Sequence, residues 1–184
     1  MKYGKIEKTD ILDGQGVRVS LYVSGCRNHC KGCHNAVACN FNYGNEYTQE
    51  TKEEILNEVG KEYISGLSLL GGEPFEQENQ EECYKLAKEV KEKYNKSVWC
   101  WTGYKYKDLI KGGEKYIDGI TNNLLENIDV LVEGEFILDK RDISPSNLWR
   151  GSTNQRVIDL NETRRTKKLS FLKDVPNSKG DKYE

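Results

Sequence analysis

The stretch Gly66-Leu67-Ser68-Leu69-Leu70-Gly71-Gly72-Glu73-Pro74 is a short apolar run that two glycines and a proline bring to an end. Further along the chain, apolar side chains recur at helical spacing at Cys83, Leu86, Ala87, Val90 and Tyr94. The run predicts a buried strand, and the later stripe predicts an amphipathic helix. Residues 66–94 therefore predict a strand, a glycine turn and a helix, which is the repeating unit of an α/β fold.

Similar patterns lie on both sides of this unit. Residues 17–23 alternate apolar and polar side chains and predict a first core strand. Apolar side chains at helical spacing between Thr51 and Tyr63 predict a helix, with Thr51 and Glu54 as its capping box. After residue 94, a helix stripe is predicted at Ile117, Ile120 and Leu124, and strands are predicted over 97–101, 128–132 and 155–160.

Strands that alternate with helices favour a parallel sheet with right-handed crossovers. Four or five such strands are too few for a complete eight-stranded barrel, so the pattern predicts an open, partial parallel β/α barrel. The carboxyl ends of parallel strands lie at one edge of a sheet. We therefore expect the loops after Val23, Leu70, Trp101 and Val132 to meet and form a single mouth.

Composition restricts the classes of function. The 184 residues include 28 Lys and Arg against 30 Asp and Glu, so no overall basic field indicates a direct nucleic-acid partner. No run approaches the roughly 20 apolar residues of a membrane span. Residues 1–7 lack the apolar segment of a secretory signal, which favours a cytoplasmic protein with reduced thiols.

The chain is expected to consist of one domain, residues 1–162, and a basic C-terminal tail, residues 163–184. The tail loses the apolar periodicity and carries seven basic against three acidic side chains. A solvated terminus is the ordinary interpretation of such a segment.

Three cysteines lie within eight residues directly after the first predicted strand, at Cys26, Cys30 and Cys33. Three thiolates in one short loop indicate a metal site. A 4Fe-4S cluster normally takes four thiolates, so a loop with three leaves one iron open to a substrate. Zinc is the alternative, because a fourth ligand for it is available at His29, His34 or Cys39.

Two features favour iron over zinc. The loop follows a predicted core strand, and no second pair of closely spaced cysteines supplies the remote half of a zinc ribbon. Cys83 and Cys100 lie in a predicted helix and strand and are interpreted as small buried apolar residues. Cys39 is left without a role.

The motif C-x-x-x-C-x-x-C after the first strand and Gly71-Gly72-Glu73-Pro74 after the second together resemble the radical S-adenosylmethionine superfamily. Alone, the glycine motif has the composition of an ordinary turn. More closely, the chain resembles the proteins that activate anaerobic ribonucleoside-triphosphate reductase. The segments that carry this resemblance are 13–18, 23–26, 32–35, 69–74, 99–104, 129–132 and 150–156. Gln15 stands where that family usually has proline, which loosens the turn before the first strand, and the tail extends past the family's usual end.

This resemblance implies a fold of the radical S-adenosylmethionine type and a specific chemistry. Cys26, Cys30 and Cys33 would hold a 4Fe-4S cluster whose open iron binds S-adenosylmethionine. An electron from reduced flavodoxin or a similar donor would cleave the cofactor to a 5′-deoxyadenosyl radical, which takes hydrogen from a glycine of the reductase and leaves a glycyl radical. The implied cofactor contacts are Gly32, Cys33, His34, Gly71, Gly72 and Glu73. No catalytic residue beyond the cluster ligands is implied.

Two other functions stay open at this stage. An activating enzyme of another glycyl-radical enzyme, such as pyruvate formate-lyase, would use the same cluster and cofactor. The chain is short for that family, and segments 101–104 and 151–156 suit the reductase activators better. The second alternative is a non-catalytic zinc-binding interaction module, which metal content would distinguish. Segment 151–156 is interpreted as a turn and is not assigned to the site.

Overall fold

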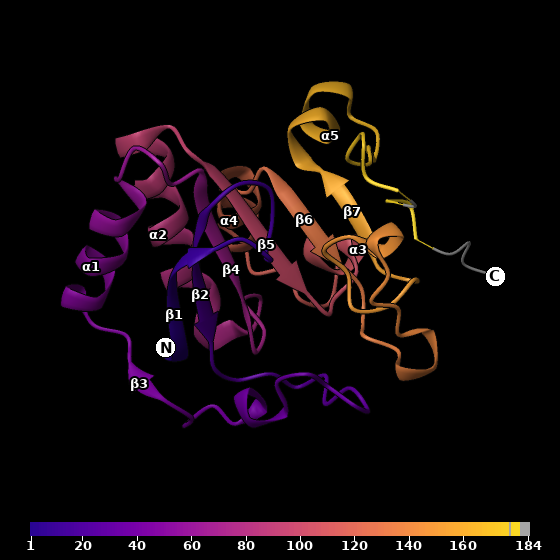
Figure 1. The fold of residues 1–184 in the computed structure, drawn as a ribbon, viewed down its shortest axis with the longest axis horizontal. Helices are drawn as coiled ribbons and strands as arrows, with labels where there is room; N and C mark the ends of the chain where they lie inside the picture. The colour runs from indigo at the N-terminus through magenta and orange to yellow at the C-terminus, as the bar shows by residue number, and fades with distance from the viewer. Residues whose placement is uncertain (177, 181–184) are drawn as a thin grey trace.

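A seven-stranded sheet with strand order β3-β1-β2-β4-β5-β6-β7 runs through the molecule (Figure 1). The computed structural model describes residues 1–176 and 178–180. The strands are β1 (Lys2–Asp10), β2 (Arg18–Val23), β3 (Asn45–Glu46), β4 (Gly66–Gly71), β5 (Ser97–Thr102), β6 (Val130–Glu133) and β7 (Arg156–Asp159). The helices are α1 (Gln49–Val59), α2 (Gln77–Tyr94), α3 (Tyr106–Leu109), α4 (Thr121–Asn127) and α5 (Leu160–Thr166), with short 3-10 turns η1 (Ala36–Cys39), η2 (Leu138–Lys140) and η3 (Pro145–Asn147).

The central strands β2, β4, β5 and β6 are parallel, as predicted. The edges differ from the prediction, because β1 pairs antiparallel with β2, and β7 pairs antiparallel with β6. The fold is therefore mixed α/β with an open sheet, not a closed barrel. The sequence did not reveal β1, since a register shift between Tyr3 and Lys5 interrupts its apolar alternation. No helix in the described part of the chain is long and apolar enough to cross a membrane.

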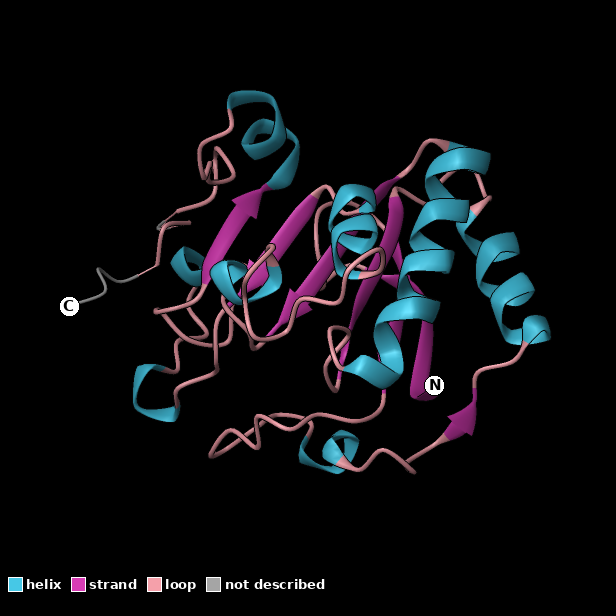
Figure 2. Ribbon diagram, turned by 180° about the vertical axis from the view of Figure 1, so that it is seen from behind, coloured by secondary structure: helices cyan, strands magenta, loops and turns pink. Residues whose placement is uncertain are grey.

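The helices α1, α2 and α4 cover one face of the sheet (Figure 2). The main core forms there, where Val19, Leu21 and Val23 of β2 belong to one buried cluster with Ile55 of α1 and Leu86 of α2. A second cluster contains Trp99, Val130, Val132, Val157 and Val175, with Trp101, Trp149 and Leu172 packed against it. Cys83 and Cys100 are fully buried in the main core, which confirms that they act as apolar residues.

Two helix boundaries differ from the prediction. Helix α1 begins earlier, because the Thr48 hydroxyl accepts the Thr51 N–H at 3.3 Å and so replaces Thr51 as the cap. Tyr63 lies beyond this helix and is 57% exposed. The stripe from Ile117 to Leu124 is only partly helical, since α4 begins at Thr121, whose hydroxyl accepts the Ile117 N–H at 2.8 Å.

The expected solvated tail is packed against the fold over its described residues. Helix α5 crosses the predicted boundary after residue 162. Beyond it, the Asp159 N–H donates to Ser170 O at 3.0 Å and the Val157 N–H donates to Ser178 O at 2.7 Å. An edge strand such as β7 presents backbone groups that need partners, and this segment supplies them. The prediction of a solvated tail also covers residues 177 and 181–184, which lie outside the described residues.

Candidate functional site

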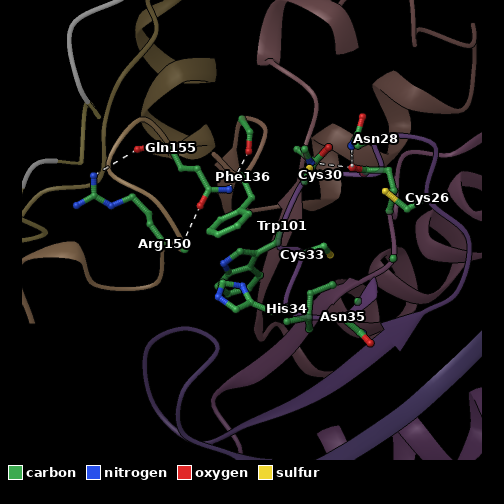
Figure 3. A pocket seen from close by; sticks show the side chains of 18 of the residues that line it. Cys26, Asn28, Cys30, Cys33, His34, Asn35, Trp101, Phe136, Arg150 and Gln155 are labelled. Atoms are coloured by element: carbon green, nitrogen blue, oxygen red, sulfur yellow. Dashed lines mark hydrogen bonds between the residues drawn. The ribbon is translucent and has the colours of Figure 1, made fainter. Parts of the chain in front are cut away.

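A cavity of about 470 Å³ lies at the carboxyl ends of the parallel strands (Figure 3). The loops after β2, β4, β5 and β6 all contribute to its wall, so the predicted single mouth is confirmed. The predicted site residues that line it are Cys26, Cys30, Cys33, His34, Gly71, Gly72 and Glu73. Its volume is within the range of small-molecule sites in proteins.

The cysteine loop, residues 24–40, folds back on its own beginning. The Gly25 N–H donates to Ala38 O at 2.7 Å, and the Cys26 N–H donates to Cys39 O at 3.2 Å. Cys26 is buried and Cys30 is half-buried, and both are free thiols. Burial raises the pKa of Cys26 to about 12 and also raises the pKa of Cys30. These thiols therefore stay protonated near neutral pH until a metal displaces their protons.

A carboxylate cluster ties the cysteine loop to the next two strand ends. The Arg27 N–H donates to Glu76 Oε1 at 2.8 Å, and its guanidinium donates to Glu76 Oε2 at 2.5 Å and to Glu78 Oε1 at 2.6 Å. The Tyr104 hydroxyl, from the loop after β5, donates to Glu76 Oε1 at 2.7 Å. Because Glu76 is only 3% exposed, these charge-assisted bonds hold the loop in place from within the fold.

Backbone packs closely against backbone at positions 71 and 72, and this packing leaves room only for glycine. Gly71 has a φ of +107°, and a Cβ on it would lie 2.7 Å from the Tyr22 backbone. A Cβ on Gly72 would lie 2.6 Å from Gly25 O and 2.9 Å from Ala38 O. The glycine pair therefore lets the end of β4 touch the cysteine loop directly.

Glu73 braces this turn from the inside. Its Oε1 accepts the Phe75 N–H at 2.9 Å, and its Oε2 accepts the Gly103 N–H at 2.7 Å and the Asn28 amide at 3.4 Å. Burial raises the pKa of Glu73 to about 7, although these hydrogen bonds oppose the shift. The carboxyl thus connects the turn after β4 to the loop after β5 and to the cysteine loop.

The raised pKa of Glu73 predicts how stability depends on pH. Between about pH 4.5 and pH 7 the folded state keeps this proton while the unfolded chain loses it, so stability falls as pH rises. The difference amounts to roughly 3 kcal/mol. We expect urea denaturation of the metal-free protein to show this loss, and Glu73→Gln to reduce the pH slope. Identical slopes for the two proteins would contradict the assignment.

The remaining predicted residues lie at the outer side of the cysteine loop. The exposed His34 lines the cavity, and its ring lies 4.8 Å from the ring of Phe136. Gly32 is not among the residues that line the cavity, and a Cβ on it would lie 2.8 Å from the Leu138 side chain. Gly32 therefore contacts a neighbouring loop, and its predicted place beside a cofactor does not follow from the cavity.

Among the candidate fourth ligands for zinc, only Cys39 lies beside the other thiols. Burial raises the pKa of Cys39, the nearby Cys33 raises it further, and a hydrogen bond with Cys26 opposes the shift. His29 is exposed, and His34 packs against Phe136. Within the described residues, no three Cys, His, Asp or Glu side chains converge on a position for a single metal ion. Three thiols that lie on one loop and line a cavity match the donor set of an iron–sulfur cluster, which is larger than a single metal ion.

Comparison with known proteins identifies the family. The sequence profile described as a 4Fe-4S single cluster domain matches residues 12–158. The anaerobic ribonucleoside-triphosphate reductase-activating protein of Enterobacteria phage T4 is 36% identical, over 85% of this chain and 93% of the relative. Those of Escherichia coli K12 and Vibrio cholerae are 36% and 39% identical, over 87% and 85% of this chain and 99% and 97% of the relatives. The chain belongs to this family of activating proteins.

Membership of the family decides between the two metals. The matched 4Fe-4S cluster domain includes all three cysteines of the loop and the glycine turn after β4. The chain therefore matches a domain that carries a 4Fe-4S cluster, which favours iron over zinc.

The cavity of this family member also contains residues without a predicted role. Tyr22 and Asp13 line it, and the Tyr22 hydroxyl donates to Asp13 Oδ2 at 2.6 Å. Burial raises the pKa of Asp13 to about 6. Trp101 and Trp149 form an aromatic wall in which Trp101 Nε1 donates to Trp149 O at 2.8 Å. Their only signal in the sequence was their place in or next to the segments that resemble the family.

Segment 151–156 turns before β7 begins at Arg156, largely as predicted, and it also contributes to the cavity. The Gln155 side chain accepts the Gly151 N–H at 2.8 Å and the Ser152 N–H at 3.2 Å. Gly151 and Gln155 both line the cavity, together with Arg150. The segment was excluded from the site because turn residues and wall residues have the same composition, and only the fold distinguishes them.

Proposed function

We propose that the protein activates anaerobic ribonucleoside-triphosphate reductase as a radical S-adenosylmethionine enzyme, generating a glycyl radical on the reductase. One observation carries the proposal: three free thiols of a single loop line a small-molecule cavity in a chain of this activating-protein family. The relatives named for the reductase favour it over pyruvate formate-lyase and other glycyl-radical enzymes as the target.

Cys26, Cys30 and Cys33 would hold the 4Fe-4S cluster. When bound, this cluster with S-adenosylmethionine supplies the reductive cleavage that yields an adenosyl radical. The cysteine loop brings its three thiols to the cavity wall, and the Arg27 contacts to Glu76 and Glu78 resist movement of the loop.

Gly71, Gly72 and Glu73 would form the turn that receives the amino end of S-adenosylmethionine, with the carbonyl oxygens of Gly71 and Gly72 as acceptors, because Glu73 O already accepts the Asn79 amide and the Glu76 N–H. The N–H of Gly72 already donates to Val23 O at 2.7 Å, and the N–H of Glu73 donates to Gly25 O at 2.9 Å. An ammonium group is a donor and needs acceptors, so this turn suits it. Cys33 and His34 would face the cofactor from the opposite wall of the cavity, and Gly32 would support them from behind.

The open sheet would be the partial β/α barrel of radical S-adenosylmethionine enzymes, with its catalytic unit in residues 1–162. Its carboxyl edge carries the cavity, as that architecture requires. A cytoplasmic location and reduced flavodoxin or a similar electron donor complete the proposal, and neither nucleic acid nor a membrane takes part.

The experiment uses anaerobically prepared protein with its cluster. We expect iron and sulfide in a ratio of four each per chain, formation of 5′-deoxyadenosine with dithionite, and a glycyl-radical signal by electron paramagnetic resonance only when the reductase is added. One equivalent of zinc without iron would contradict the proposal. If the protein carries the cluster and cleaves S-adenosylmethionine but no radical forms on the reductase, the assigned partner is contradicted.

The basic side chains of the C-terminal segment provide a test of partner contact. Arg165, Lys167 and Lys168 are exposed at and after the end of α5. Exchanging Lys167 and Lys168 for glutamate is expected to weaken binding of the reductase severalfold at low salt, because exposed charges mainly affect association. Uncoupled cofactor cleavage stays unchanged. Titration calorimetry measures the affinity for the reductase. Equal affinities of the wild type and the variant would remove this surface from the proposal.

A further inference from the structure

The backbone around Cys26, the first thiol of the cysteine loop, is held from two directions. The N–H of Cys26 donates to Cys39 O at 3.2 Å, which fixes the peptide before this residue. The peptide after it carries the N–H of Arg27, and that N–H donates to Glu76 Oε1 at 2.8 Å. The loop itself therefore supplies one of the two holds, and a carboxylate from outside the loop supplies the other.

Glu76 stands on a rigid part of the fold. It directly precedes helix α2, and its backbone O accepts the N–H groups of Asn79 at 2.8 Å and Gln80 at 3.0 Å. Its own N–H donates to Glu73 O at 3.2 Å, in the glycine turn. A polar side chain at this position ordinarily caps the helix, but the Glu76 side chain makes no such bond. It reaches to the cysteine loop instead.

A second donor fixes the direction of this carboxylate. The Tyr104 hydroxyl, from the loop after β5, donates to the same Glu76 Oε1 at 2.7 Å. Glu76 is 3% exposed, so these bonds lie inside the protein, where a carboxylate accepts strongly. Side chains that are locked by packing and further hydrogen bonds hold a site in its productive geometry. The N–H of Arg27 therefore has a rigid acceptor.

The ion pair between Arg27 and Glu76 is the more exposed part of their contact. The Arg27 side chain is 51% exposed, and its guanidinium is shared between Glu76 and Glu78 and lies 4.4 Å from the centre of the Phe41 ring. Ion pairs at the surface typically contribute little to stability. The bond from the backbone N–H lies next to Cys26 and does not depend on the arginine side chain.

We propose that Glu76 is a positioning residue for the cluster: it holds the backbone N–H that follows Cys26 and so keeps this thiol in the geometry that binds iron. The inference rests on the proposed function, because it takes Cys26 as a cluster ligand. It deepens that function by giving a side chain outside the ligand set and the glycine turn a part in retaining the cluster. Groups that orient metal ligands from behind are typically worth 10- to 100-fold in metal affinity.

The first test uses the metal-free protein, in which alkylation by iodoacetamide, mapped by mass spectrometry, reports access to each thiol. Glu76→Ala removes the acceptor of the Arg27 N–H, and we expect Cys26 to be labelled at least severalfold faster than in the wild type. Cys83 is fully buried on α2 and is expected to keep its wild-type rate. Unchanged labelling of Cys26 would overturn the proposal. An equal increase at Cys83 would do the same, because Glu76 would then serve the whole fold.

Glu76→Gln separates the hydrogen bond from the charge. The amide oxygen of glutamine can still accept the Arg27 N–H and the Tyr104 hydroxyl, whereas the negative charge facing the guanidinium is lost. We expect this variant to label Cys26 at nearly the wild-type rate. Labelling as fast as in Glu76→Ala would contradict the role given to the backbone hydrogen bond.

The second test uses anaerobically loaded protein. In Glu76→Ala we expect iron loss to a chelator about 10-fold faster or more, and an altered electron paramagnetic resonance spectrum of the reduced cluster, because a displaced thiolate changes the surroundings of its iron. Glu78→Ala removes the other partner of the guanidinium and leaves the bond to the Arg27 N–H in place. We expect it to keep the wild-type iron retention and spectrum. Equal iron loss in the two variants, or none in Glu76→Ala, would overturn the proposal.

A further control separates the effect from general loosening of the fold. Val90→Ala creates a cavity in the core beside α2 and is expected to lower stability without a change in the spectrum. The same altered spectrum in this variant would count against Glu76. Failure of the wild type to take up any cluster would contradict the proposed function, whereas labelling of Cys26 in the metal-free protein still decides whether Glu76 holds the loop.

Discussion

Cys30→Ala is expected to lower the iron content to near zero and the rate of 5′-deoxyadenosine formation by more than about 100-fold, since even groups behind the ligands are worth 10- to 100-fold. Cys30 is one of the three thiols of one loop that line the cavity. A cluster on two remaining thiolates has two irons without a protein ligand and is readily lost. Iron analysis and product chromatography measure both effects.

The matched control for this change is Cys83→Ala. Cys83 is also a cysteine, but it is fully buried on α2 and belongs to the apolar core. Its replacement removes a thiol and some packing, and it leaves the three thiols of the loop in place. We expect it to retain the cluster. Full iron content in Cys30→Ala, or loss of the cluster in Cys83→Ala, would discredit the ligand assignment.

Gly72→Ala is expected to destabilise the fold by about 3 kcal/mol and to prevent cluster assembly. The new methyl group would lie 2.6 Å from Gly25 O and 2.9 Å from Ala38 O. Both neighbours are backbone atoms and cannot rotate away as a side chain would. The cysteine loop must therefore separate from the end of β4, which also breaks the Glu73 N–H bond to Gly25 O. Urea denaturation and iron incorporation report the two consequences.

Gly119→Ala is the control for the glycine substitution. Gly119 has a φ of +74°, yet no atom lies within 4 Å of a Cβ built on it. Its replacement introduces backbone strain of about 1 kcal/mol without any collision. We expect it to assemble the cluster normally. If Gly72→Ala were no less stable than Gly119→Ala, close packing at the glycine turn would not be the reason for Gly72.

Local pattern alone was sufficient for the central sheet and for the cysteine loop. The apolar runs of β2, β4, β5 and β6 are readable because parallel strands are buried on both faces. Three cysteines in eight residues after a core strand indicate metal chemistry regardless of how the loop folds. The glycine turn was also visible, although its composition did not show that the two glycines are needed for contact with the backbone of Tyr22 and Gly25.

The edges of the sheet and the walls of the cavity required the tertiary structure. Strand β1 is half-exposed and irregular, and the segment after α5 takes its place through backbone hydrogen bonds to β7. Gln155 lies far from the cysteine loop in sequence, and a turn-forming glutamine has no local mark of its place in the cavity wall. The sequence by itself determined the chemistry of the ligands, because donor atoms are a property of residue type. The structure decided which distant side chains hold those donors in place, because that depends on contacts between segments that no local pattern encodes.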